Sequence, residues 1–334
     1  MDYFDFAQIP VNLENQFGEG SYPESGQQGT TASSSRTPTT VSASTAFNPQ
    51  SMLDTQPSDL ILVSSDSVFF YVHCHRISGA STNYFNGLLS PARLQEANSG
   101  TPLHVLPEVA EVLNIVVHTI YGMPCTHFGP SFATATTAIK ALTKYGVPVQ
   151  QYAAPALPLY TLIRSYAPTH AIDAYALAAA HDLEPLAVAI SPHLLAFHLS
   201  ALSEELASAL GPKYLLRLFH LHGQRMDALK HLLLQLPTPH EPTAVCGVEE
   251  QGKLTRGWAF AAAQLVWDAR PSISTHAIDM ALSPLRSQLS CHLCINSLEQ
   301  RLQEVISEWA AVKNHLVILC TSIAIVTRNG FLDL

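Results

Sequence analysis

The chain has 334 residues, a formal net charge of −9 and only 13% charged side chains. Its length predicts two or three folded units. The acidic balance excludes direct nucleic-acid binding, which needs Lys and Arg side chains to neutralise phosphates. Because so few residues are charged, we expect apolar surface to be buried extensively or shared with partner proteins.

The N-terminal segment and the cysteines indicate the compartment. Residues Met1–Pro10 carry Asp2 and Asp5 and lack the basic patch and apolar run of a secretory signal. We therefore expect an intracellular protein, cytoplasmic or nuclear, in which the six cysteines are reduced thiols rather than a disulfide framework.

An apolar tail is expected at residues 316–334. Its run Leu316–Val326 is much shorter than the roughly 20 residues needed to cross a bilayer, so we expect no membrane partner. The run is apolar enough to aggregate if exposed, which predicts that it packs on the helices.

Residues 1–56 are predicted to form a disordered, low-complexity tail. From Glu19 to Gln56 the sequence is dominated by Ser, Thr, Gly, Gln and Pro, which cannot bury enough apolar surface to offset the entropy lost on ordering. Order is expected from Asp59. The apolar run 60–63, a polar turn and the aromatic run 68–72 predict a β-hairpin.

Helices and one more strand are predicted after the hairpin. Apolar residues recur at helical spacing from Ile77 to Leu89 with a break at Ser78-Gly79, which predicts two short helices. Residues 103–106 alternate like a strand. The next helix should bury a face made of Val109, Val112, Val116 and Ile120.

Several motifs in this region resemble the BTB/POZ domain, particularly its divergent fungal members. The segments are Ser-Asp-Leu-Ile-Leu-Val-Ser-Ser-Asp, Phe-Tyr-Val-His, Ser-Thr-Asn-Tyr-Phe-Asn-Gly-Leu-Leu and Val-Val-His-Thr-Ile-Tyr-Gly, in the order that the family shows. The matching positions are Asp59, Ser65, Asp66, Phe70, Val72, His73, Ser81, Phe85, Leu88, Val105 and Tyr121. Cys74-His75 and Gly79-Ala80 depart from the family pattern. The resemblance implies an α+β BTB/POZ-like domain at 57–150, followed by a mainly α-helical extension.

The resemblance also implies a function and some roles. It implies a non-catalytic protein–protein interaction or scaffold protein, with a substrate adaptor for a cullin-type ubiquitin ligase as the alternative. His73 would anchor the junction between a strand and the first helix through a polar partner, either Asp59 or a backbone carbonyl. Self-association into a homodimer would use a surface around Leu60, Ile77 and Phe85.

Beyond Pro148 the spacing of apolar residues predicts helices. A helical extension is expected at 151–240, and a C-terminal helical region with a cysteine cluster at 241–315. The predicted helices are Leu159–Tyr166, His170–His181, Leu183–Leu202, Lys213–Leu236 and Leu298–His315.

No motif of nucleotide, acyl or metalloprotease chemistry is present in the sequence. The generic enzyme alternative is a nucleophilic thiol, Cys74 or Cys125, brought near His127 by the fold. Buried free thiols are much commoner, so we expect no enzyme activity and no catalytic residue.

A structural metal site is the sharpest prediction. Cys291 and Cys294 have the Cys-x-x-Cys spacing that lets two thiolates bind one tetrahedral Zn²⁺, and Cys246 lies in a Pro-rich break where a loop can fold back. The residues that could complete the set are His240, Glu249, Glu250 and His292. The alternative is that the three cysteines are small apolar residues at a helix-packing seam. We expect no other cofactor.

Overall fold

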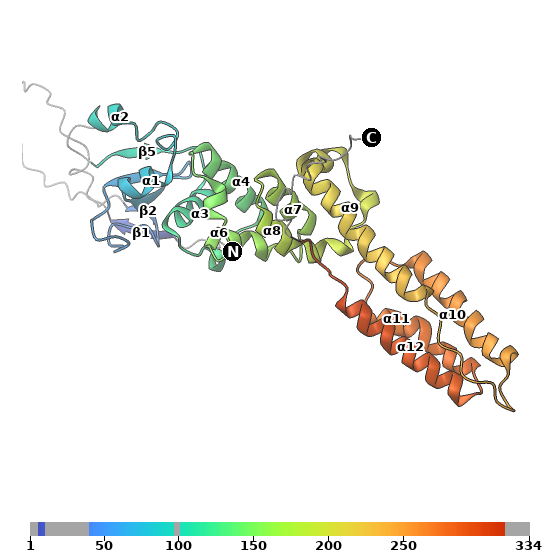
Figure 1. Ribbon diagram of the computed structural model, residues 1–334. Coiled ribbons are helices and arrows are strands. Elements are labelled where there is room, and N and C mark those ends of the chain that lie inside the picture. Colours follow the sequence, from blue (N-terminus) through green and yellow to red (C-terminus); the bar gives the residue numbers. More distant parts are fainter. Residues whose placement is uncertain (1–5, 11–39, 97–100, 318–334) are drawn as a thin grey trace, which may run out of the picture. The chain divides into compact units, whose positions relative to one another are not determined.

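The structure is a computed structural model that describes residues 6–10, 40–96 and 101–317 (Figure 1). The chain divides into two compact units. Unit 1 comprises residues 1–170 and 181–186, and unit 2 comprises residues 171–180 and 187–334. The described part is mixed α+β and mainly helical, which confirms the coarse fold class.

A small sheet forms the base of unit 1. Its strand order is β1-β2-β4-β3-β5, and the strands are β1 (Phe6–Pro10), β2 (Thr40–Ser44), β3 (Leu60–Val63), β4 (Val68–Val72) and β5 (Leu103–Val105). Strands β3 and β4 form the predicted antiparallel hairpin, with Leu60 opposite Val72. Strand β5 adds in parallel to β3. Strands β3 and β4 are almost wholly buried, which explains why their sequences are continuous apolar runs.

The prediction of a disordered tail through residue 56 is wrong for the described part of that segment. Strand β2 pairs in parallel with β4, and Phe47 is completely buried. The Phe47 ring lies edge-on to His118 and Tyr121, with centroid distances of 4.9 and 5.1 Å. The composition gave a wrong prediction because a segment can be held by backbone hydrogen bonds and one buried aromatic side chain, and this requires few apolar residues.

Two helices of unit 1 lie between β4 and β5 along the chain, and the others follow β5. They are α1 (Cys74–Ala80), α2 (Pro91–Glu96), α3 (Ala110–Tyr121), α4 (Phe132–Lys144), α5 (Val149–Tyr152) and α6 (Pro158–Ser165), with the 3₁₀ turn η2 (Thr126–Phe128). Helix α3 buries Val112, Val116 and Ile120 as predicted, whereas Val109 is its partly exposed N-cap. The predicted second short helix is instead a run of turns, because Tyr84, Phe85 and Asn86 have positive φ angles near 55°.

The predicted junction at His73 is present. His73 is buried, its Nε2 lies 2.9 Å from the Gln56 carbonyl oxygen, and its Nδ1 lies 2.8 Å from the Tyr121 hydroxyl. Since a carbonyl only accepts, Nε2 carries the proton and the Tyr121 hydroxyl donates to Nδ1. Neither of these hydrogen bonds involves Asp59. The Asp59 Oδ1 instead accepts a hydrogen bond from the Cys74 N–H at the start of α1. The backbone-carbonyl alternative was therefore the right one.

The three residues predicted to form a dimer surface lie in the core. Leu60, Ile77 and Phe85 have no exposed area, and the Phe85 ring stacks on Tyr145 at 4.1 Å. Side chains that fill the core of their own chain cannot also form a surface, so this choice of residues is wrong. Self-association itself stays a prediction.

Acid should destabilise unit 1 through His118. This imidazole is 1% exposed, and burial lowers its pKa from 6.5 to about 4. The unfolded chain therefore binds the proton more tightly, so the stabilisation is present above pH 6.5 and is lost as the pH falls from 6.5 towards 4. At about 1.4 kcal/mol per pKa unit, the loss is about 3 kcal/mol. Urea unfolding at several pH values should show this slope, and a His118→Gln variant should show a shallower one, because burial also lowers the pKa of His104 and His181. An equal slope in both proteins would contradict the assignment.

Unit 2 is helical. Its elements are α7 (Ala171–Ala180), the end of α8 (Glu184–Ile190), the 3₁₀ turns η3 (Ser191–Ala196) and η4 (Leu199–Ala201), α9 (Glu204–Leu234), α10 (Val248–Asp268), α11 (Thr275–Leu282), η5 (Ser283–Gln288) and α12 (His292–Ala311). The helix predicted at 183–202 breaks into 3₁₀ turns at Ser191-Pro192. The second half of α9 packs with α10 and α12 (Figure 1).

The boundary between the two units differs from the predicted domain boundaries. Helices α5 and α6 belong to unit 1, so the boundary expected at 150 lies at 170. The boundary expected at 240 falls inside unit 2, because α9 shares one core with the helices that follow it. Within α9, Gly211 has a φ of 66° and a ψ of 168°, and Pro212 starts a new helical segment there.

Side chains from α10 and α12 cap the end of α9. The buried Arg301 donates to the carbonyl oxygens of Leu232 and Gln235, and the Trp258 indole N–H donates to that of Leu233. These are carbonyls that a helix end leaves without intrahelical partners. Helix α9 is thereby fixed to the two helices beside it. Among the described helices, none combines the length and apolar character needed to cross a membrane.

Candidate metal centre

Three of the predicted ligands meet in unit 2 together with one histidine. The ligand atoms of His240, Cys246, Cys291 and Cys294 all lie within 4.8 Å of one another. His240 was one of four residues considered for the fourth position. Of the others, His292 and Glu249 are exposed, and Glu250 forms an ion pair with Lys253 at 2.7 Å.

The distances match those of a tetrahedral zinc site. Cys246 Sγ and Cys294 Sγ are 3.7 Å apart, and His240 Nε2 lies 3.4 Å from the sulfurs of both Cys291 and Cys294. With bonds of about 2.3 Å to sulfur and about 2.0 Å to nitrogen, tetrahedral Zn²⁺ would set its ligands about 3.8 Å (S to S) and about 3.5 Å (S to N) apart. Three of the six ligand pairs thus already have the spacing of one ion site, and the other pairs lie within 4.8 Å.

The first turn of α12 supplies the Cys-x-x-Cys pair. Cys291 is the N-cap residue and Cys294 lies in the first turn, where a helix leaves backbone N–H groups without intrahelical partners. The N–H of Cys294 is the main cause that lowers the pKa of Cys291 to about 7. Burial raises the pKa of Cys294 to about 12, so that thiol would need a cation to become a thiolate at neutral pH.

A loop between α9 and α10 supplies the other two ligands. Cys246 lies at the end of a tight turn in which Thr243 and Cys246 exchange backbone hydrogen bonds of 3.0 and 3.2 Å. Two side chains hold the loop: Ser297 donates to the Thr238 carbonyl, and Gln251 donates to the His240 carbonyl. The sequence signal for this loop is its Pro content, which prevents a helix from running through it.

The histidine has the tautomer that a metal ligand needs. Its Nδ1 lies 2.7 Å from the Glu241 carbonyl oxygen, which can only accept, so Nδ1 carries the proton. The lone pair of Nε2 therefore faces the sulfurs of Cys291 and Cys294. A ring oriented by a carbonyl on its other nitrogen is typical of zinc-bound histidines.

The packing-seam alternative explains only part of these contacts. Cys246 and Cys294 do belong to the apolar core of unit 2, next to Trp258 and Leu298. An apolar seam, however, gives no reason for an imidazole nitrogen to point at two thiols. The residues present therefore fit a metal ion.

The thiols proposed for an enzyme have other surroundings. Cys74 Sγ lies 3.8 Å from the Ser78 hydroxyl. Burial raises the pKa of Cys125 to about 11, which is the opposite of what a nucleophilic thiolate requires.

No protein-family model, curated protein or solved structure matches the chain. The resemblance to BTB/POZ domains therefore stays a prediction from the motifs of unit 1.

Proposed function

We propose that this chain is a non-catalytic protein-interaction protein whose C-terminal helices are held together by a structural zinc ion. The observation that carries the proposal is the Cys₃His set described above. Four protein ligands fill a tetrahedral coordination shell and leave no position for a substrate or a reactive water. Such closed sites stabilise folds, whereas catalytic zinc sites keep one position open.

Zinc fits these ligands better than other common ions. Thiolate ligands are soft and disfavour Mg²⁺ and Ca²⁺, which select oxygen. A mixed sulfur and imidazole set with tetrahedral spacing favours zinc. When bound, the ion would keep the thiols deprotonated and join the loop before α10 to the first turn of α12.

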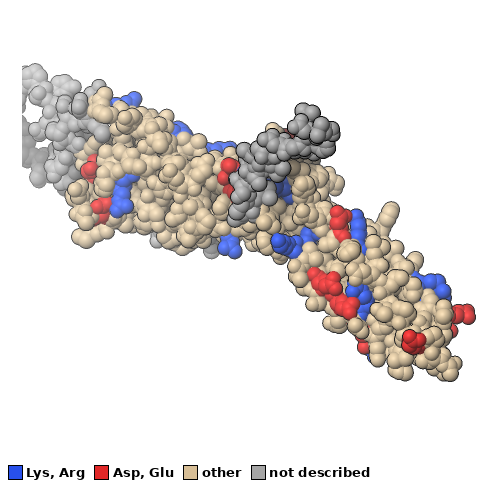
Figure 2. All heavy atoms as spheres, in the orientation of Figure 1, with Lys and Arg blue, Asp and Glu red and all other residues tan. Residues whose placement is uncertain are grey.

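An apolar surface on α10 supports the interaction part of the proposal. Phe260 and Trp267 lie seven residues apart, so they share one helix face, and they are 74% and 89% exposed. Exposed Leu234 and Leu236 border the neighbouring groove between α9 and α10, which has a volume of about 350 Å³. Charged side chains, coloured in Figure 2, also lie on the helices of unit 2. Large apolar side chains that are exposed together on one helix face are typical of protein-binding sites.

Elemental analysis tests the zinc site. Protein purified without added metal should contain about one equivalent of zinc, because four ligands preformed around one point define one ion site. A Cys294→Ser variant should lose it. A Cys125→Ser variant, in which a buried cysteine of unit 1 is replaced, is the matched control and should keep it. Wild-type protein with less than about a tenth of an equivalent would rule the site out.

Affinity purification tests the interaction part separately. Proteins that co-purify with the wild-type chain and then bind it directly in purified form should be lost from a Phe260→Ser, Trp267→Ser variant. A Lys140→Gln variant, changed at an exposed position of unit 1, should retain them. Equal binding by all three proteins would exclude this surface.

A further inference from the structure

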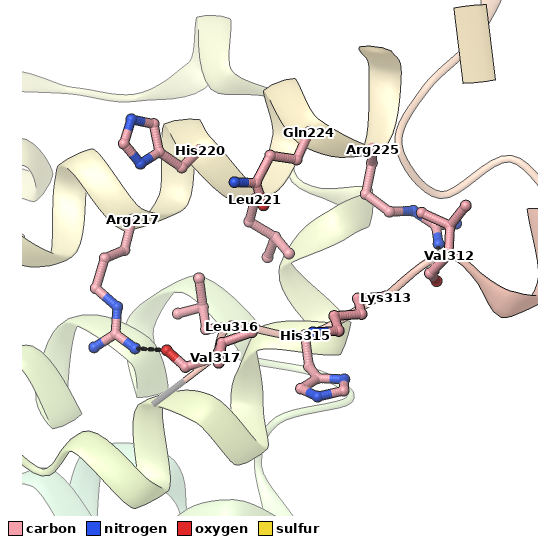
Figure 3. A pocket seen from close by; sticks show the side chains of 10 residues that line it. All are labelled: Arg217, His220, Leu221, Gln224, Arg225, Val312, Lys313, His315, Leu316 and Val317. Carbon is pink, nitrogen blue, oxygen red and sulfur yellow. Dashed lines mark hydrogen bonds between the residues drawn. The ribbon is translucent and has the colours of Figure 1, made fainter. Parts of the chain in front are cut away.

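A short strap closes a basic pocket on the side of α9. The strap consists of residues 312–317, which follow α12. Two arginines of α9 hold it: Arg217 donates to the Val317 carbonyl at 2.9 Å, and Arg225 donates to the Val312 carbonyl at 2.7 Å. The strap N–H of Leu316 donates to the Ser191 hydroxyl, and the Leu316 side chain is buried. Figure 3 shows the arginines at the two ends of the resulting pocket.

The pocket gathers nitrogen donors in an acidic protein. It has a volume of about 280 Å³ and ten lining residues, all labelled in Figure 3. Three of the ten are Lys or Arg, whereas the whole chain has 17 in 334 residues and a net charge of −9. Two more are histidines, and none of the described lining residues is acidic. This concentration of positive charge favours an anion.

A bound anion would compensate the buried positive charge of Arg225. Its side chain is buried, its Nε donates to the Pro271 carbonyl at 3.2 Å, and its guanidinium lies 3.8 Å above the Trp309 ring. Together with the bond to Val312, these contacts use two of the five guanidinium N–H groups. Carbonyls and an aromatic face are neutral, and no described carboxylate is bonded to Arg225, so its buried charge lacks a counter-charge.

The exposed rim provides donors from both sides. His220 and Gln224 lie on α9 one turn apart, and Lys313 and His315 lie on the strap. In Figure 3 the two imidazole rings point outward, away from the space between α9 and the strap. Their ammonium, amide and imidazole groups all can donate N–H bonds. The volume is at the small end for a ligand site, which suits a compact group rather than a nucleotide.

We propose that this pocket binds a phosphate group, either as free phosphate or as the head of a small phosphomonoester. A tetrahedral dianion can accept bonds from several directions at once, which suits donors on both α9 and the strap. The site lies beyond the end of α12, whereas the metal centre lies at the start of that helix.

Isothermal titration of the full-length protein with inorganic phosphate, in a low-salt buffer, tests the proposal. We expect saturable binding that weakens at least about tenfold in a Lys313→Gln variant, because one charge-assisted bond is lost. Lys313 is exposed, so the fold should be unaffected. A Lys230→Gln variant, changed at an exposed lysine of α9 outside the pocket, should bind like wild type. An Arg225→Lys variant keeps the charge but loses the planar donor pair, so it should also bind more weakly.

Glycerol phosphate and acetate identify the ligand class. Tighter binding of glycerol phosphate than of inorganic phosphate would indicate a phosphomonoester, and the reverse would indicate free phosphate. Acetate that binds as tightly as phosphate would overturn the proposal. Absence of binding at about 10 mM phosphate, or equal binding by the wild-type and Lys313→Gln proteins, would overturn it as well.

Discussion

Removing the metal should lower the thermal stability of unit 2 by about 8–16 °C. A ligand at about a thousand times its dissociation constant stabilises the folded state by about 4 kcal/mol. For a unit of this size, each kcal/mol corresponds to about 2–4 °C. The loss should be this large because chelation would leave Cys246 and Cys294 as buried thiols around an empty centre. Circular dichroism at 222 nm, recorded during heating with and without a strong chelator, measures the change.

Two variants make the chelator experiment specific. The Cys294→Ser protein should start at the lower melting temperature and should not respond to the chelator, because it already lacks a ligand. The Cys125→Ser protein should respond like wild type, since Cys125 lies in unit 1. Identical melting curves of the wild-type protein with and without chelator would show that the cluster contributes to packing alone.

Replacing Trp258 with alanine should cost unit 2 about 3–5 kcal/mol, the range observed when a large aromatic is deleted from a core. Trp258 has no exposed area and lies in the core that α9, α10, α11 and α12 share. It also donates to the Leu233 carbonyl at the end of α9, so the variant loses a buried hydrogen bond as well as volume. Urea unfolding followed by circular dichroism gives the free-energy difference.

The same helix offers a matched control. Trp267 is 89% exposed, and a Trp267→Ala variant should change stability by less than about 0.5 kcal/mol. A Trp258→Phe variant, which keeps most of the volume and loses the N–H donor, should fall between the two. If Trp258→Ala and Trp267→Ala had equal effects, Trp258 would not anchor the core.

Local patterns predicted the elements of unit 1 well where one face was strongly apolar. The hairpin at 60–72 and the buried face of α3 follow from runs and spacings that few other structures satisfy. The residues of the proposed dimer surface failed for a related reason. A sequence pattern identifies apolar residues such as Phe85, but it does not say whether they face the core or a partner.

The metal centre was predictable in part. The Cys-x-x-Cys spacing is set by one turn of helix, so Cys291 and Cys294 could be paired from the sequence alone. Cys246 and His240 come from a loop, and their approach depends on hydrogen bonds from Ser297 and Gln251 that no spacing reveals. The basic pocket could not be predicted from the sequence. Arg217 and Lys313 are almost a hundred residues apart, and they line one pocket only because the strap runs beside α9.

The loop ligands also set up a long-range link along the backbone. Cys246 and Cys294 are 48 residues apart, and α10 and α11 lie between them. An ion bound by both would close this stretch into a ring, much as a disulfide would, and such a closure removes about 4 kcal/mol of chain entropy from the unfolded state. A protease cut in the segment between α10 and α11 would then leave two pieces joined through the ion. A chelator would leave only the packing of the shared core to hold them together.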